Sequence, residues 1–312
     1  MSKAESLTPK SEGNPRSERG APKFARGSHP ALQCLGLCPT RGPFQGRFAN
    51  STASSKFGLG NSFGFRHSGF GFQRRLYAAL LFVTALAANA AEVPPLKICL
   101  LSACAEYQSD KSLSEFQAYL EAHYRVLCQR VSGKDKGDDL PGLEALDNSD
   151  LMILFTRRVK LPADQLERIK KYLASRRPIV GIRTASHAFE NYLELDREVL
   201  GGDYKGHHGD DEGEVRIAAG QTNHPVLAGV LPFKTRRLYK NAAPAADVTI
   251  LLNGFTPDYH EPIAWVRQRD GRRVFYTSMG TPEDFAQENF RRLLVNAIFW
   301  ATKRDEAATR RP

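Results

Sequence analysis

Residues 180–189 read VGIRTASHAF and continue the apolar run Pro178-Ile179-Val180. A short apolar run followed by small and polar residues is typical of a buried strand that turns sharply into a helix. In many enzymes such a turn carries a nucleophile, but the residue at the turn here is Arg183. A guanidinium group is neither a nucleophile nor a base at neutral pH. The stretch therefore predicts the turn of a catalytic site without its nucleophile.

Apolar runs upstream of this stretch predict strands that alternate with helices. A continuous apolar run is typical of a parallel strand buried on both faces. Strands are predicted at residues 96–101, 124–128, 150–155 and 178–182, and helices at 112–124 and 162–175. This alternation predicts an α/β fold with a doubly wound, mostly parallel sheet and helices on both of its faces.

The pattern changes downstream, where strands follow one another. They are predicted at residues 214–218, 248–252, 262–266 and 273–277. Asp270 and Gly271 join the last two, which is a β-hairpin signal. An amphipathic helix at 290–302 closes the domain. We therefore expect one domain over residues 96–303, with a C-terminal hairpin plus helix, and a disordered tail over residues 304–312.

The positive charge of the chain is concentrated near its N-terminus. The formal net charge is +10, but residues 1–91 hold 12 of the 44 Lys and Arg residues and three of the 34 acidic residues. The residues after Ala91 therefore carry a net charge of +1. A near-neutral domain lacks the basic surface that binds nucleic acid, so no nucleic-acid partner is expected.

Residues 73–91 have the anatomy of a secretory signal peptide. Arg74 and Arg75 precede an apolar run of about a dozen residues that ends in small residues near Ala90. This run is shorter than the ~20 residues that a membrane-spanning helix needs. We expect cleavage near Ala90, a periplasmic or secreted domain and no stable membrane insertion after cleavage. A retained anchor is the alternative.

Residues 1–72 show no hydrophobic periodicity and are rich in Gly, Ser, Phe and Arg. Such a segment buries too little apolar surface to fold. We expect the natural start of the protein near residue 70, so that the preceding residues are translated upstream sequence. A genuine disordered tail is the alternative.

The cysteines indicate no disulfide framework. Two of the five lie in the N-terminal extension, which leaves Cys99, Cys104 and Cys128. No pair has the spacing of a zinc site. One disulfide is possible, and a buried free thiol is expected for Cys99, which lies in an apolar strand.

Five motifs, taken in order, resemble the ThuA family of trehalose-utilisation-like proteins. They are Gly181-Ile182-Arg183-Thr184-Ala185-Ser186-His187-Ala188-Phe189, Leu200-Gly201-Gly202, Asn223-His224-Pro225-Val226-Leu227-Ala228-Gly229, Glu261-Pro262-Ile263-Ala264-Trp265-Val266 and Gly271-Arg272-Arg273-Val274-Phe275-Tyr276-Thr277-Ser278-Met279-Gly280. The resemblance extends over residues 96–303. It implies the flavodoxin-like fold of the class I glutamine amidotransferases and a link to sugar metabolism.

The sequence departs from the amidotransferase pattern at its catalytic positions. Arg183 stands where amidotransferases have the cysteine nucleophile, and Thr281-Pro282-Glu283 stands where they have His-Pro-Glu. Many ThuA relatives have Gly-His where this chain has Gly280-Thr281. We therefore do not expect glutaminase activity.

Polar side chains after the turn are candidates for ligand binding. Arg183 offers five donors to a carboxylate, a phosphate or a sugar hydroxyl, and Thr184 and Ser186 follow it. Open α/β sheets bind ligands at the carboxyl ends of their strands. The structural alternative is that Arg183 pairs with a carboxylate and stabilises the turn. His187, further along, is a candidate catalytic residue or a structural histidine.

The glycine-rich loop of residues 201–211 supplies a second group of candidates. His207 and His208 are adjacent, and Asp203 lies nearby. A histidine is an acid–base catalyst near neutral pH or a metal ligand. Adjacent loop residues seldom reach one metal, so we expect His207 and His208 to be catalytic and Asp203 to bind substrate, with a metal site as the alternative.

His260 and Glu261 precede a predicted strand. We expect both to face the same cleft, with His260 as a substrate ligand and Glu261 as an acid or base, and a solvated loop is the alternative. His224, in Asn-His-Pro, is expected to be a structural turn residue.

These observations predict an exported protein that binds or acts on a carbohydrate, of the trehalose, keto-sugar or glycoside type. The alternatives are a non-catalytic sugar-binding or interaction module and a metal-dependent hydrolase. A glycosidase normally uses two facing carboxylates, and the sequence identifies no such pair. It also identifies no cofactor, and it is compatible with a homo-oligomer.

Overall fold

The computed structural model describes residues 94–241 and 243–311. The predicted N-terminal extension and signal peptide lie outside these residues. Within the described part of the chain, no helix is long and apolar enough to span a membrane. Cys99, Cys104 and Cys128 are free thiols.

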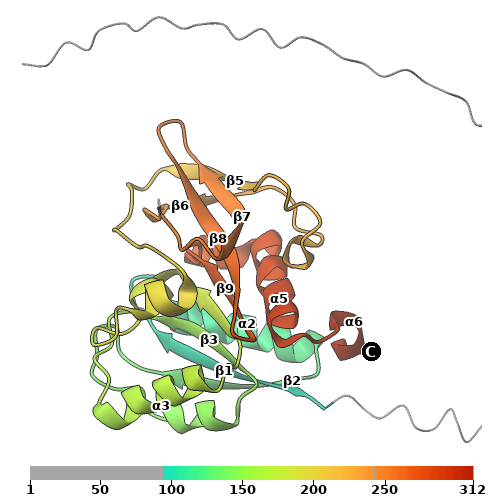
Figure 1. The fold of residues 1–312 in the computed structure, drawn as a ribbon. Coiled ribbons are helices and arrows are strands. Elements are labelled where there is room, and N and C mark those ends of the chain that lie inside the picture. Colours follow the sequence, from blue (N-terminus) through green and yellow to red (C-terminus); the bar gives the residue numbers. More distant parts are fainter. Residues whose placement is uncertain (1–93, 242, 312) are drawn as a thin grey trace, which may run out of the picture. The chain divides into compact units, whose positions relative to one another are not determined.

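Nine strands within the described residues form one mixed sheet in the order β2-β1-β3-β4-β9-β8-β7-β5-β6 (Figure 1). Neighbours run parallel from β2 to β9 and antiparallel from β9 to β6. The strands are β1 (Leu96–Ala103), β2 (Val126–Ser132), β3 (Leu151–Thr156), β4 (Ile179–Ile182), β5 (Glu212–Ile217), β6 (Phe233–Arg236), β7 (Val248–Phe255), β8 (His260–Arg269) and β9 (Arg272–Thr277). The predicted α/β class is confirmed.

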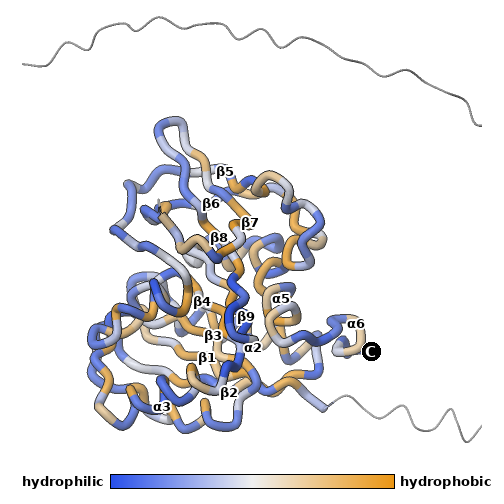
Figure 2. Tube along the Cα trace, viewed as in Figure 1, coloured by the Kyte–Doolittle hydropathy of each residue, from blue (hydrophilic) through white to orange (hydrophobic). Residues whose placement is uncertain are grey.

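Helices pack on both faces of the parallel strands. Every residue of β3 and β4 is buried, as expected for strands covered on both sides. The core on one face includes α2 (Ser109–His123) and α5 (Glu288–Thr302), and the core on the other includes α3 (Ala163–Ala174) (Figure 1). Figure 2 shows the apolar residues concentrated along the central strands.

The carboxyl ends of β1, β3 and β4 share one edge of the sheet. β1 pairs with β3 through Ser102 and Phe155, and β3 pairs with β4 through Leu154 and Gly181, all in parallel. Arg183 directly follows β4 and begins the short helix η2 (Arg183–His187). The predicted strand-to-helix turn at Arg183 is therefore confirmed.

Several short elements were not predicted from the sequence, and three of them lie in the C-terminal half. They are β6, α4 (Pro282–Ala286) and α6 (Glu306–Thr309). Residues 306–309 form a helix where a disordered tail was expected, because the helix docks on the start of β2. The Arg125 N–H donates to the Thr309 carbonyl at 2.7 Å, and Thr309 is buried.

Candidate functional site

The turn after β4 holds Arg183 in a strained conformation. Its φ angle is 47°, in the left-handed region that disfavours residues other than glycine. The Tyr276 hydroxyl donates a 2.8 Å hydrogen bond to the Arg183 carbonyl. Gly280 has a φ of 137° and lies close to the end of β4. A Cβ added to it would be only 2.6 Å from Ile182 Cγ2. Neighbouring strands thus hold the turn in place, as is usual where strain is kept at functional positions.

The Arg183 side chain is completely buried. Nη1 donates to the Ser278 carbonyl at 2.7 Å, and Nη2 donates to the Arg237 carbonyl at 3.2 Å. The guanidinium carbon lies 3.9 Å from the Tyr107 ring centroid and 4.7 Å from that of Tyr239. Carbonyls and aromatic rings thus contact the guanidinium directly, and the buried Asp284 carboxylate interacts with its charge without forming an ion pair. The guanidinium thereby connects the turn after β4 to the loops that contain Ser278 and Arg237.

His187 is a neutral imidazole in this environment. Its exposed fraction is 5%, and a 3.0 Å hydrogen bond joins Nδ1 to the Ser186 hydroxyl. Burial, together with Arg158, Arg157 and Arg183, lowers the pKa of His187 to about 3. The ring is therefore uncharged at neutral pH. It can donate one hydrogen bond and accept another, but it is a weak base.

Three tyrosines surround this part of the site, and the sequence did not indicate them. The tyrosine cluster consists of Tyr107, Tyr204 and Tyr239. The Tyr204 ring stacks on His187 with centroids 4.4 Å apart and lies 4.6 Å from the Tyr239 ring. Tyr107 and Tyr239 are buried, whereas Tyr204 is partly exposed. Tyr204 is therefore the member of the cluster that a ligand can reach.

His207 and His208 point in different directions because the loop is extended. Lys205 and His208 donate backbone hydrogen bonds to the carbonyls of Lys240 and Leu238. Successive side chains of an extended segment point to opposite sides. His207 is accordingly exposed, and its Nδ1–H donates to the His208 carbonyl at 2.7 Å. His208 is the histidine of this pair that turns toward the protein.

His208 forms a hydrogen-bonded pair with Glu261. His208 Nε2 lies 2.7 Å from Glu261 Oε1, and the His208 ring stacks on Tyr259 with centroids 3.7 Å apart. Glu261 is 6% exposed, and its Oε2 accepts a 2.8 Å hydrogen bond from the Asn241 backbone. Because Nε2 donates to the carboxylate, Nδ1 is the basic atom of the neutral ring. A buried carboxylate that orients an imidazole is the arrangement of an acid–base pair.

Asn241 is a further residue that the sequence did not indicate. Its side chain is completely buried, and neither Oδ1 nor Nδ2 has a hydrogen-bond partner among the described residues. The Thr184 hydroxyl is buried in the same way. Buried polar atoms of folded proteins are normally paired. These two side chains therefore have unused hydrogen-bonding capacity, although neither is exposed to solvent in this conformation.

The remaining candidates make contacts of their own. Asp203 forms an ion pair with Lys205 at 3.0 Å. His260 is exposed and stacks on Phe255 with centroids 5.6 Å apart. His224 accepts a hydrogen bond from the Val226 backbone, which fits the expected turn role.

Thr281 serves a structural purpose at the same edge. Its hydroxyl accepts from the Asp284 backbone, while Asp284 Oδ2 accepts from the backbones of Gly280 and Thr281. This reciprocal arrangement caps helix α4. Thr281 therefore serves as the cap of this helix.

One segment joins the two groups of candidate residues. The Arg237 carbonyl holds Arg183, the Tyr239 ring packs near His187, and the Asn241 N–H holds Glu261. Residues 237–241 therefore link the turn after β4 to the His208–Glu261 pair. Within the described ranges, no group of three or more His, Cys, Asp or Glu side chains is placed to hold a metal ion.

Comparison with known proteins yields one family. A family model named ThuA, described as trehalose utilisation, matches residues 103–301. No match is found among curated protein sequences.

Two solved structures of ThuA-like proteins share the fold. The protein of Parabacteroides merdae ATCC 43184 is 19% identical with a TM-score of 0.54, and the match covers 67% of this chain and 90% of that one. The protein of Bacteroides uniformis ATCC 8492 is also 19% identical with a TM-score of 0.54, and the match covers 71% of this chain and 97% of that one.

Proposed function

The chain belongs to the ThuA family, and on this premise we propose that it binds a carbohydrate beside the Tyr204 ring and transfers a proton with the His208–Glu261 pair. The family's description as trehalose utilisation supports a carbohydrate as the substrate class. The observation that carries the reaction type is the 2.7 Å contact between His208 Nε2 and the buried Glu261 carboxylate.

The environment of the pair supports proton transfer. Glu261 fixes the orientation of the imidazole through the hydrogen bond to Nε2, and the Tyr259 ring restricts its rotation. A positioned histidine with a carboxylate partner lowers the barrier to proton transfer by about 3–5 kcal/mol, equivalent to the ~10²–10⁴-fold effect of general acid–base catalysis. One such pair is enough to remove a proton from the carbon atom beside the carbonyl group of a keto-sugar.

Aromatic and amide groups nearby support a sugar as the ligand. Small-molecule sites combine apolar or aromatic surfaces with a few placed polar groups. The partly exposed Tyr204 ring offers such a surface, and the unpaired Asn241 amide offers a donor and an acceptor. Arg183 excludes the cysteine chemistry of the amidotransferases, because a guanidinium cannot act as a nucleophile.

The test is turnover and binding of trehalose and its keto derivatives by wild type, His208→Ala and Glu261→Gln. We expect both variants to lose about tenfold to a thousandfold in turnover, the effect of removing an acid–base group. His207→Ala is the matched control, since it removes an exposed imidazole from the same loop without touching Glu261. Turnover that survives in His208→Ala, or falls equally in His207→Ala, would contradict the assignment.

A non-catalytic sugar-binding module is the second candidate. Both oxygens of Glu261 already have hydrogen-bond partners, His208 Nε2 and the Asn241 backbone N–H. This favours a structural role for the carboxylate, as in a binding module. Saturable sugar binding without turnover of any oxidised or unoxidised disaccharide would identify such a module.

We also propose that the protein is exported, on the basis of the signal-like sequence at residues 73–91. An N-terminal peptide map of the native protein tests this. A mature N-terminus near Ala91 is expected, whereas any peptide from residues 1–65 would contradict both the cleavage and the predicted start near residue 70.

A further inference from the structure

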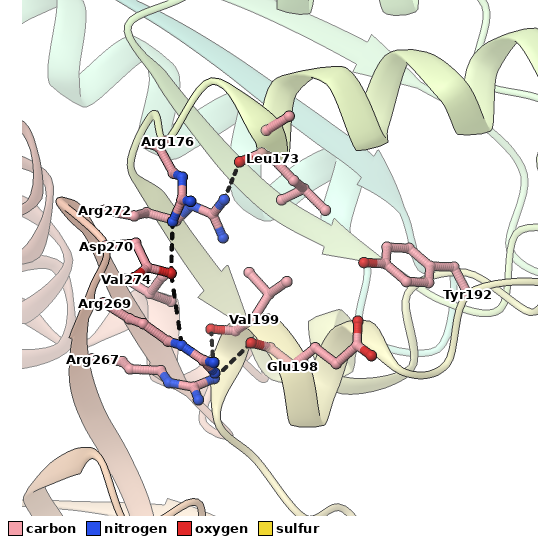
Figure 3. A pocket seen from close by; sticks show the side chains of 11 residues that line it. Leu173, Arg176, Tyr192, Glu198, Val199, Arg267, Arg269, Asp270, Arg272 and Val274 are labelled. Carbon is pink, nitrogen blue, oxygen red and sulfur yellow. Dashed lines mark hydrogen bonds and ion pairs between the residues drawn. The ribbon is translucent and has the colours of Figure 1, made fainter.

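A polar pocket lies at the other end of the parallel strands, away from the turn that holds Arg183. Its volume is about 530 Å³, and it lies between the end of α3, the β8–β9 turn and the helical segment η3 (Asp196–Leu200) (Figure 3). Arg272 begins β9, and β9 runs parallel to β4. The pocket is therefore at the amino ends of these strands, whereas Arg183 follows the carboxyl end of β4.

Arginines outnumber acidic side chains in the lining of this pocket. The charged members are Arg176, Arg267, Arg269, Arg272, Glu198 and Asp270. Arg267 is already neutralised, since its buried guanidinium pairs with Asp247 at 2.9 Å. Arg176 and Arg269 share the exposed Asp270 carboxylate at 2.7 and 3.8 Å. Exposed pairs of this kind contribute little and rearrange readily.

Arg272 lacks a carboxylate partner among the described residues. Its Nη2 donates to the Leu173 carbonyl at the end of α3, and its Nε is buried without a hydrogen-bond partner. Burial and the nearby Arg176 lower the pKa of Arg272. The Asp270 carboxylate opposes this shift, but it also pairs with Arg176 and Arg269. Because three guanidinium groups share this one carboxylate, a bound anion would improve the charge balance.

The rest of the lining is apolar or aromatic. It is formed by Leu173, Ala174, Val199, Val274 and Tyr192. Figure 3 shows the Arg176 and Arg272 guanidinium groups side by side and the Tyr192 ring on the far side of the pocket. Such a surface suits a ligand with a charged end and a compact body rather than a free inorganic ion.

We propose that this pocket binds a small organic oxyanion, with its phosphate or carboxylate group on Arg272 and Arg176 and its body against Leu173, Val199 and Val274. Guanidinium groups match both oxyanions through paired N–H donors. The site is separate from the proposed sugar site, so it can be present whether or not His208 is catalytic.

The test is calorimetric titration of the purified protein with glucose 6-phosphate, citrate, inorganic phosphate and neutral glucose. We expect saturable binding of glucose 6-phosphate or citrate that weakens at least about tenfold in Arg272→Gln, which loses charge-assisted hydrogen bonds. Arg130→Gln, which removes an exposed arginine from β2, is the matched control and should bind as wild type does. The tighter of the two organic probes identifies the preferred oxyanion.

Because Arg272 also caps α3, a melting curve accompanies each variant. If Arg272→Gln is poorly folded, Arg176→Gln decides, since Arg176 is half exposed and its loss should spare the fold. Absence of saturable binding by both organic probes would overturn the proposal. So would binding that is unchanged in a folded Arg272→Gln or Arg176→Gln protein, or binding that is equal for glucose and glucose 6-phosphate.

Discussion

His187 makes the stability of the protein depend on pH. Its folded-state pKa is about 3, whereas that of an unfolded histidine is ~6.5. Between these values the unfolded state binds more protons than the folded state, so stability falls as the pH is lowered through this window. We expect this residue alone to cost about 2 kcal/mol of unfolding free energy between pH 7 and pH 5.

Urea unfolding of wild type and His187→Gln at pH 7 and pH 5 measures this contribution. The variant should lose less stability than wild type over the interval, because glutamine does not titrate. Equal losses would show that His187 is solvated in the folded protein.

At the scale of residues, the sequence predicted positions better than contacts. The strand before Arg183 is a continuous apolar run, so the turn could be predicted. The burial of Arg183 could not be, since arginine is almost never fully buried without partners. Those partners, Tyr107 and Tyr239, come from loops far apart in the chain, and no local pattern indicates that they meet.

At the scale of elements, Gly280 determines how closely the β9–α4 connection approaches the turn after β4. An alanine there would combine an unfavourable φ of 137° with a Cβ 2.6 Å from Ile182 Cγ2. We expect Gly280→Ala to lower the unfolding free energy by about 1–3 kcal/mol more than Gly229→Ala. Gly229 is the control because it has a φ of 69° but no heavy atom within 4 Å of an added Cβ. If chemical denaturation shows the same loss of unfolding free energy in both variants, the turn after β4 can shift to accommodate the added methyl group.

Helix α6 contributes to stability although it is short. The Tyr124 hydroxyl donates to Glu306 at 3.0 Å, and the Arg125 N–H donates to the Thr309 carbonyl at 2.7 Å. Removing residues 305–312 would expose the Tyr124 ring and break these hydrogen bonds.

We expect this truncation to cost about 1–3 kcal/mol, measured by thermal or urea unfolding. Glu306→Gln serves as a milder control, because it keeps the helix. An unchanged melting temperature in the truncated protein would support the disordered tail that the sequence predicted.

The strands differ in how readily they are predicted. β3 and β4 are buried along their whole length and read as apolar runs. β6 has only four residues, Phe233–Arg236, and alternates buried and exposed positions at the edge of the sheet. Its strand character depends on pairing with β5 rather than on its own composition.

At the scale of the whole molecule, the sheet presents two chemically different rims. The carboxyl ends of the parallel strands carry the turn with Arg183 and His187, and the amino ends of β4 and β9 border the arginine-lined pocket. The position of the turn at the first rim was predictable, because the apolar run of β4 ends directly before Arg183. The second was not, because its arginines come from separate elements and become neighbours only when the sheet is assembled.

The segment of residues 237–241 connects the turn after β4 to the His208–Glu261 pair. It accepts a hydrogen bond from Arg183 at one end and donates one to Glu261 at the other. Groups that share a backbone segment have non-additive energies. In a double-mutant cycle of Arg183→Met and Glu261→Gln, we expect a coupling free energy of about 0.5–3 kcal/mol in unfolding experiments. Strict additivity would mean that each end of the segment relaxes independently, so that changes at the turn could be tolerated without any effect on the orientation of His208.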